Sequence, residues 1–246
     1  GDSAELQDAL VLARLASSLA FPVLLVGESG SGKSQLARLM HAWSGREGNF
    51  LSFRCANLSE AVLGTELFGN GRGVSGLLDA ARKGTLFLDE VFDLPRALQS
   101  KLVAWLDDNF PRGPESEPLI DVHIVAATRH GVADLSRTAT MRASLDQVLP
   151  GGRNPSSIRE DLRKHLSRVI VVMPPLRGRM DDVPMLVRHY VEVYCRRFGL
   201  EPISMPQATL DRFTARRWPG NLRELQTAVE EWVEEWGHDG ERLVQS

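Results

Sequence analysis

The sequence predicts an α/β fold: a five-stranded parallel sheet between helices, followed by a small all-α lid domain. Two patterns predict it. Short apolar runs alternate with stretches of helical periodicity as far as Met173, and only helical patterns follow Pro174 and Pro175. Strands that alternate with helices are typical of a parallel sheet, and adjacent prolines are typical of a junction. We therefore expect an α/β domain over residues 1–174 and a helical lid over residues 175–246.

Five short runs rich in apolar residues predict the buried strands. The runs are Val23–Val26, Phe50–Phe53, Thr85–Leu88, Val122–Ala127 and Val169–Val172. Apolar residues recur at helical spacing after the first and third runs, and we interpret them as packing faces rather than binding surfaces. They are Leu36, Leu39, Met40 and Trp43, and then Leu98, Leu102, Trp105 and Leu106.

Three helices are predicted for the lid. The first has an apolar face over residues 183–194, and Gly199 is its expected stop. The second covers Gln207–Arg216. The third follows Trp218-Pro219-Gly220-Asn221 and carries Leu222, Leu225, Val229 and Trp232 on one face.

The composition narrows the class of protein. A chain of 246 residues with 43% hydrophobic residues can bury a sizeable core. No apolar run approaches the roughly 20 residues needed to span a bilayer, and Gly1–Glu5 lacks the features of a secretion signal, so we expect a cytoplasmic protein. A formal net charge of −3 argues against nucleic-acid binding by this segment, because such binding usually needs a basic surface.

Neither the cysteines nor the histidines are spaced like metal ligands. Cys55 and Cys195 lie far apart, with no paired Cys or His nearby, which fits a reducing compartment and two core residues. We therefore expect no metal other than the magnesium that accompanies a nucleotide.

Residues 27–34 fit the pattern G-x-x-x-x-G-K-[ST] of a phosphate-binding loop, between a predicted strand and a predicted helix. Its residues are Gly27, Glu28, Ser29, Gly30, Ser31, Gly32, Lys33 and Ser34. Glycines let the backbone N–H groups wrap around phosphates at the positive end of a helix. Lys33 would neutralise the outer phosphates, and Ser34 would ligate Mg²⁺. A chance glycine-rich turn is disfavoured by the flanking strand and helix.

An acidic pair, Asp89 and Glu90, ends the third predicted strand. Such a pair suits ATP hydrolysis, in which one carboxylate holds the magnesium shell and the next polarises water. We assign the metal role to Asp89 and the role of base to Glu90. The segment 71–76 also fits G-x-G-x-x-G, but no strand precedes it, so we reject a dinucleotide site there.

Five ordered blocks resemble the AAA+ domain of bacterial enhancer-binding proteins, which act on the sigma-54 form of RNA polymerase. The blocks are Val23–Gly30, Thr65–Gly69, Gly84–Glu90, Pro174–Arg177 and Trp218–Leu225. The resemblance implies an AAA+ P-loop NTPase fold, assembly into a ring that is often hexameric, and ATP bound between neighbouring subunits. It also implies a transcription-related protein partner.

The resemblance assigns three further residues. Arg223 corresponds to the lid arginine that senses the bound phosphate. Arg159, which opens Arg-Glu-Asp-Leu, corresponds to the arginine finger that reaches the neighbouring subunit's ATP. Thr128 stands at the first sensor position, after the fourth strand.

The sequence departs from the family in the loop that contacts sigma-54. The family carries Gly-Ala-Phe-Thr-Gly-Ala there, whereas here only Asn70–Gly84 separates the second block from the third, and Gly71–Ser75 offers no aromatic side chain to hold a partner. We therefore expect that this protein does not remodel sigma-54 polymerase in the usual way.

Four positions near the catalytic centre also differ. Arg54 replaces the asparagine that positions the catalytic glutamate, and we hypothesise that it pairs with Glu90 and restrains it. Arg129 replaces the sensor asparagine, and His165 replaces the second finger. Ser34, in contrast, restores the standard magnesium ligand where the family often has glutamate.

Three functions remain in competition. The first is an ATPase module of a transcriptional regulator, and the second is an ATP-gated assembly module whose hydrolysis is slow or absent. The third, a small-molecule kinase, is disfavoured by the Trp218–Leu225 block and the helical lid. Little sequence follows the last predicted helix, so we expect any helix-turn-helix to lie outside this segment.

Overall fold

The computed structural model describes residues 1–19, 21–71, 73–110, 121–129 and 158–244. The chain forms two compact units. One contains residues 9–27 and 33–173, and the other contains residues 1–8, 28–32 and 174–246. The predicted domain boundary at residues 174 and 175 stays a prediction, since residues from the start of the chain and from the phosphate loop group with the lid.

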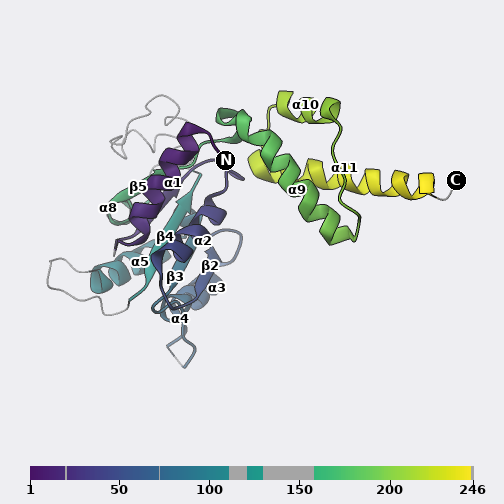
Figure 1. The fold of residues 1–246 in the computed structure, drawn as a ribbon. Helices are drawn as coiled ribbons and strands as arrows, with labels where there is room; N and C mark the ends of the chain where they lie inside the picture. The colour runs from purple at the N-terminus through teal and green to yellow at the C-terminus, as the bar shows by residue number, and fades with distance from the viewer. Residues whose placement is uncertain (20, 72, 111–120, 130–157, 245–246) are drawn as a thin grey trace. The chain divides into compact units, whose positions relative to one another are not determined.

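A five-stranded sheet forms the centre of the first unit (Figure 1). Its strands are β1 Val23–Val26, β2 Phe50–Arg54, β3 Thr85–Asp89, β4 His123–Thr128 and β5 Val169–Val172. They are ordered β2-β3-β4-β1-β5, and every pair of neighbours is parallel. The predicted five-stranded parallel sheet is confirmed, with boundaries within a residue of those expected.

Helices precede and connect these strands. They are α1 Ala4–Ser17, which begins in the second unit, α2 Lys33–Ser44, α3 Glu60–Phe68, α4 Leu77–Ala80, α5 Arg96–Asn109 and α8 Glu160–Leu166. A 3-10 turn, η1 Val91–Asp93, follows β3. Parallel strands need such crossover connections, because consecutive strands must start at the same edge of the sheet.

The main core of this unit packs one face of the sheet against α5. Alternate residues of a strand share a face, so Leu86 and Leu88 of β3 point the same way and meet Leu102 and Leu106 within one cluster. Burying each such leucine stabilises the fold by about 1.5–3 kcal/mol. This packing fixes the sheet, and therefore the edge at which the strands end.

The loop between α3 and α4 is narrow where it leaves the fold. The Asn70 N–H donates to the Val74 carbonyl at 3.3 Å, and the Asn70 side chain accepts from the Val74 N–H. A Cβ on Gly76 would overlap the Leu67 carbonyl, so the two backbones touch at this neck. The Asn70–Ser75 loop is therefore closed at its base by backbone contacts and by the Asn70 side chain.

The second unit is helical from residue 176 onward. Its elements are η3 Leu176–Gly178, η4 Met180–Asp182, α9 Val183–Phe198, α10 Gln207–Ala215 and α11 Asn221–Val244 (Figure 1). As predicted, α9 ends at Gly199, which has φ +70°. Trp218 is almost fully buried in the core of these helices and donates its Nε1–H to the Phe213 carbonyl at 3.0 Å.

Within the described ranges, no helix combines the length and hydrophobicity that crossing a bilayer needs. The same part of the chain contains no group of three or more His, Cys, Asp or Glu side chains placed to hold a metal ion. Cys55 and Cys195 are both buried, as expected for core residues. Burial and the nearby Asp89 raise the pKa of the Cys55 thiol, which therefore stays protonated.

Candidate nucleotide site

The carboxyl ends of β1, β3 and β4 lie side by side at one edge of the sheet, where parallel α/β folds bind their ligands. Gly27 follows β1, and its N–H donates to the Thr128 carbonyl at 3.1 Å, which extends the ladder of β1 and β4 by one bond. Lys33 opens α2, is buried, and donates its ammonium to the Gly27 carbonyl at 2.7 Å. The start and end of the phosphate loop are thereby tied together.

Glu90 turns sharply away from the strand that precedes it. Its backbone is left-handed, with φ +55° and ψ +51°, a conformation that costs a non-glycine residue about 1 kcal/mol or more. Its side chain is only 5% exposed, and one carboxylate oxygen accepts the Arg129 N–H at 3.1 Å. The end of β4 thus fixes the proposed catalytic base by a backbone hydrogen bond.

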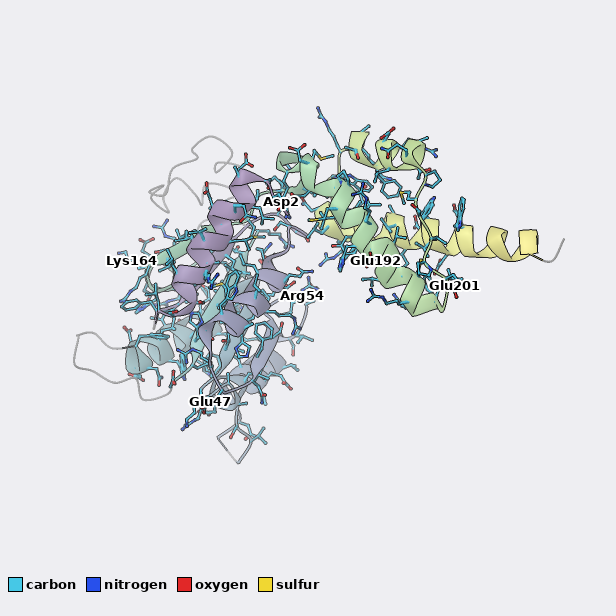
Figure 2. The ribbon with its side chains drawn as sticks, viewed as in Figure 1. Asp2, Glu47, Arg54, Lys164, Glu192 and Glu201 are labelled. Atoms are coloured by element: carbon cyan, nitrogen blue, oxygen red, sulfur yellow. The ribbon has the colours of Figure 1, made fainter. Side chains whose placement is uncertain are left out.

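Arg54 pairs with Asp89, so the hypothesis that it pairs with Glu90 is wrong. The Arg54 Nε lies 3.6 Å from a carboxylate oxygen of Asp89. The register explains the choice of partner, because Arg54 and Asp89 lie directly opposite each other on β2 and β3. Arg54 is more than half exposed at the end of its strand (Figure 2), and the left-handed turn carries Glu90 away.

Arg129 serves the site through its backbone, while its side chain is held elsewhere. Its guanidinium lies 3.3 Å from a carboxylate oxygen of Asp93, which sits in the turn just after Glu90. Thr128, the sensor residue before it, is fully buried. No signal in the sequence pointed to Asp93, because a lone aspartate in a short turn forms no motif.

Residues 28–32 of the phosphate loop group with the lid, and the Glu28 side chain is held there. Its two oxygens accept hydrogen bonds from the Arg177 guanidinium at 2.6 and 2.7 Å. The Asn221 amide donates to Glu28 at 3.1 Å and to the Ser29 carbonyl at 3.0 Å. Arg223, the predicted phosphate sensor, donates to the Ser29 hydroxyl at 3.3 Å. Sequence reasoning missed the roles of Arg177 and Asn221.

Ser34, the predicted magnesium ligand, is exposed at the start of α2. Its hydroxyl donates to the neighbouring Gln35 side chain at 3.2 Å. Exchange of such an exposed neutral hydrogen bond for a metal costs little, so Ser34 remains suited to the role assigned to it.

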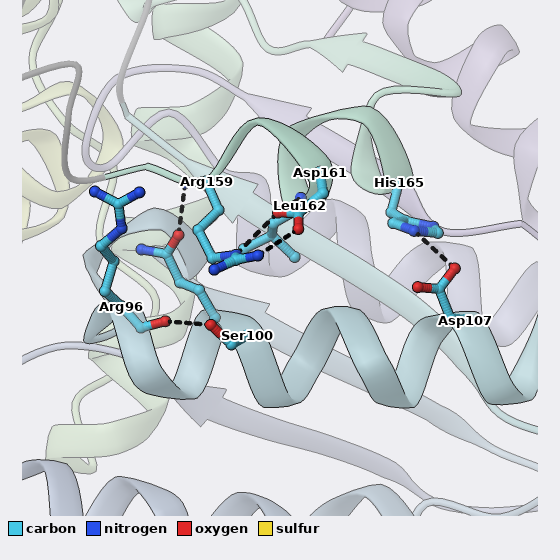
Figure 3. A network of polar contacts seen from close by, with 8 residues as sticks. Arg96, Ser100, Asp107, Arg159, Asp161, Leu162 and His165 are labelled. Carbon is cyan, nitrogen blue, oxygen red and sulfur yellow. Dashed lines mark hydrogen bonds and ion pairs between the residues drawn. The ribbon is translucent and has the colours of Figure 1, made fainter.

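Arg159, the predicted finger, precedes α8 and is bound to its own helix (Figure 3). Its guanidinium makes two hydrogen bonds to Asp161, at 3.0 and 2.6 Å. These bonds lower the pKa of Asp161, which is therefore ionised at neutral pH. The Arg159 N–H donates to the side chain of Gln99 on α5 at 2.9 Å. Gln99 itself is anchored to the Leu94 carbonyl at 2.8 Å.

His165, at the position of the family's second arginine finger, contacts α5. His165 Nε2 lies 3.3 Å from a carboxylate oxygen of Asp107 on that helix (Figure 3). Arg163, two residues before His165 on α8, donates to both oxygens of Glu160 one turn away. The side chains of His165 and Arg163 are therefore both held by acidic partners in the same subunit.

The parallel sheet, the phosphate loop after β1, the acidic pair after β3 and the helical lid together define an AAA+ domain. Comparison with known families agrees. The Sigma-54 interaction domain family matches residues 1–150, and the AAA+ ATPase lid domain matches residues 177–235. The chain belongs to the Sigma-54 interaction domain family.

Similar proteins are regulators of transcription. The chain is 35% identical over 220 residues to the putative uric acid sigma-54-dependent transcriptional regulator UacR of Escherichia coli, and the match covers 85% of this chain and 34% of UacR. It is 36% identical over 230 residues to the DNA-binding transcriptional regulator NtrC of Azospirillum brasilense, which covers 89% of this chain and 44% of NtrC. The chain therefore spans less than half the length of these relatives.

A solved structure shows the same fold. NtrX from Brucella abortus in complex with ATP is similar with a TM-score of 0.76 and 30% identity, over 95% of this chain and 51% of NtrX. The structure of NtrX in complex with ADP gives the same TM-score.

Proposed function

We propose that this chain is the nucleotide-binding module of a sigma-54-dependent transcriptional regulator, and that it binds ATP with Mg²⁺ and hydrolyses it in a ring of subunits. The observation that carries the proposal is the convergence of Lys33, Asp89, Glu90 and Thr128 at the carboxyl edge of one parallel sheet. The ATP and ADP complexes of NtrX support the choice of nucleotide.

The residues present fit ATP and Mg²⁺. Ser34 and Asp89 offer a hydroxyl and a carboxylate, the oxygen ligands that Mg²⁺ prefers. The Ser31 hydroxyl is buried and has no hydrogen-bond partner among the described residues, and a phosphate oxygen is an acceptor that would satisfy it. Bound Mg²⁺ would neutralise charge on the phosphates.

The residues of the chain have separate roles in the hydrolysis of ATP. Lys33 is anchored at the Gly27 carbonyl beside the phosphate loop, which places a positive charge at its end. Glu90 accepts a water proton as the base, and the Arg129 N–H fixes the carboxylate orientation that this transfer needs. Thr128 is the last residue of β4 and directly precedes Arg129, which supplies this N–H.

Arg159 acts on the nucleotide of a neighbouring subunit in this proposal. Its guanidinium must first leave Asp161, because a bidentate pair uses the N–H groups that would bind a phosphate. Hydrolysis therefore depends on assembly. The missing Gly-Ala-Phe-Thr-Gly-Ala loop supports a further part of the proposal, that this chain does not remodel sigma-54 polymerase in the usual way.

A second candidate is an ATP-gated assembly module whose hydrolysis is slow or absent. Two contacts favour it: Arg54 occupies Asp89, and Asp161 occupies Arg159. Both contacts take a group needed for hydrolysis and leave the phosphate loop unaltered. Assembly would then be the output of ATP binding.

Phosphate release separates the two candidates. We expect the wild-type protein to hydrolyse ATP, and Glu90→Gln to lower the rate about 10²–10⁴-fold while nucleotide still binds. Lys33→Ala should abolish binding. A wild-type rate no higher than that of Glu90→Gln would eliminate the ATPase and leave the assembly module.

The ring is tested by molecular mass in solution with and without a non-hydrolysable ATP analogue. We expect the mass to rise with the analogue, and an unchanged mass would contradict both candidates. Arg159→Ala should reduce hydrolysis by about 10³-fold or more without loss of nucleotide binding. The matched control is Lys164→Ala, an exposed cation on the same helix that should leave the rate unchanged.

A further inference from the structure

Four successive residues of the phosphate loop are each bonded to the part of the chain that follows Pro174, within one compact unit. Glu28 and Ser29 receive the bonds described above. The Gly30 carbonyl accepts the Leu222 N–H at 2.9 Å, and the Ser31 carbonyl accepts the Arg179 guanidinium at 2.7 Å. A Cβ on Gly30 would overlap the Gly220 carbonyl, so the loop and the turn before α11 touch backbone to backbone. The lid therefore determines the path of this loop.

Glu28 is an unexpected residue in a loop that binds phosphates. A carboxylate beside a polyphosphate repels it, and Glu28 cannot donate a hydrogen bond to it when ionised. The bidentate pair with Arg177 cancels this charge and uses both oxygens. Glu28 is therefore placed to hold the loop rather than to touch the nucleotide.

Asn221 links the Leu176 backbone to Glu28 and Ser29 of the phosphate loop. It is fully buried with φ +55°, its side-chain oxygen accepts the Leu176 N–H at 2.7 Å, and its amide donates to Glu28 and to the Ser29 carbonyl. Only a side chain that both accepts and donates can make all three bonds. An aspartate could not, and its charge would oppose that of Glu28.

We propose that Glu28, Arg177 and Asn221 form a positioning clamp that preorganises the phosphate loop for the nucleotide. The inference rests on the proposed function, because it assumes that the loop binds ATP. A loop held in the binding conformation raises apparent affinity by the factor by which its population increases. In this proposal the three residues do not contact the nucleotide and act through the backbone of residues 28–31.

The test is a double-mutant cycle read out as the Kd of a fluorescent ATP analogue with Mg²⁺. We expect Glu28→Gln and Arg177→Gln each to raise the Kd about tenfold, and the double variant to be no weaker than the weaker single variant. Asn221→Asp should also raise the Kd, while kcat at saturating ATP stays within about twofold of wild type, as expected for positioning without catalysis. The control is Arg197→Gln, which removes an equally short ion pair with Glu230 and should leave the Kd unchanged.

Each other outcome overturns the clamp. Tighter binding by Glu28→Gln would mean that its charge merely repels phosphate, and an unchanged Kd would mean that the pair is a surface contact. Effects of Glu28 and Arg177 that multiply would show two independent roles. If the wild-type protein and the Arg197→Gln control both fail to bind the analogue, the proposed function fails instead.

Discussion

His123 is a buried polar side chain that the fold makes poorly able to carry a charge. It begins β4, is fully buried, and neither ring nitrogen has a hydrogen-bond partner among the described residues. Burial, with a smaller effect of the Arg46 guanidinium, lowers its pKa to about 4. We expect folding stability to depend on pH through this residue.

The direction and size of this pH dependence follow from the pKa of His123 in the folded and unfolded states. The folded-state pKa of about 4 lies below the ordinary value of 6.5, so the unfolded chain binds the proton more readily. The stability is fully present above pH 6.5 and is lost as the pH falls towards 4. At about 1.4 kcal/mol per pKa unit, the loss is on the order of 3 kcal/mol over the whole range and about 2 kcal/mol at pH 5.

Urea unfolding at pH 7.5 and pH 5 measures this loss, and the variant His123→Leu isolates it. Leucine has no proton to gain, so the variant should lose about 2 kcal/mol less than wild type between the two pH values. At pH 7.5 its stability should be close to that of wild type, because the described structure shows no hydrogen bond to lose. The control His189→Leu changes an exposed histidine and should keep the wild-type pH dependence. The reasoning is refuted if His123→Leu and wild type lose equal stability.

Two further predictions concern the nucleotide site. Gly30→Ala should weaken nucleotide binding more than tenfold, because its left-handed φ and the Gly220 carbonyl both oppose a Cβ, whereas Gly45→Ala, with φ +66° and open space around it, should only lower stability by about 1–2 kcal/mol. Equal nucleotide affinities of the two variants would contradict the close approach. Arg54→Asn should lower the Mg²⁺ concentration needed for half-maximal nucleotide binding by up to about fivefold, as expected for loss of an exposed cation beside Asp89. A magnesium titration in which the two proteins coincide would rule this out.

The fold could be predicted because each element carries a local signal. Short apolar runs such as Val23–Val26 mark strands, and stretches of helical periodicity follow them. Gly199 has no side chain to oppose the left-handed backbone that ends α9. The phosphate loop and the acidic pair are also short, contiguous patterns. Signals of this kind need no knowledge of how distant segments meet.

The partners within the site depend on distant segments, and here the sequence was insufficient. Which carboxylate Arg54 meets follows from the register of β2 and β3 and from the left-handed turn at Glu90. The bonds from Arg177 and Asn221 to Glu28 cross 149 and 193 residues. No periodicity or motif reports on such contacts. The residues of the site could therefore be predicted from the sequence, but their hydrogen-bond and ion-pair partners could not.

The narrow neck of the Asn70–Ser75 loop affects how this protein can change. Because backbone contacts close the loop at its base, residues can be added beyond the neck without a shift of α3 or α4, and a longer loop costs little entropy. Insertion of the family's Gly-Ala-Phe-Thr-Gly-Ala segment would therefore be tolerated by the fold. The length of this loop can thus change by a single insertion or deletion, while Lys33, Asp89 and Glu90 keep their places at the ends of other elements.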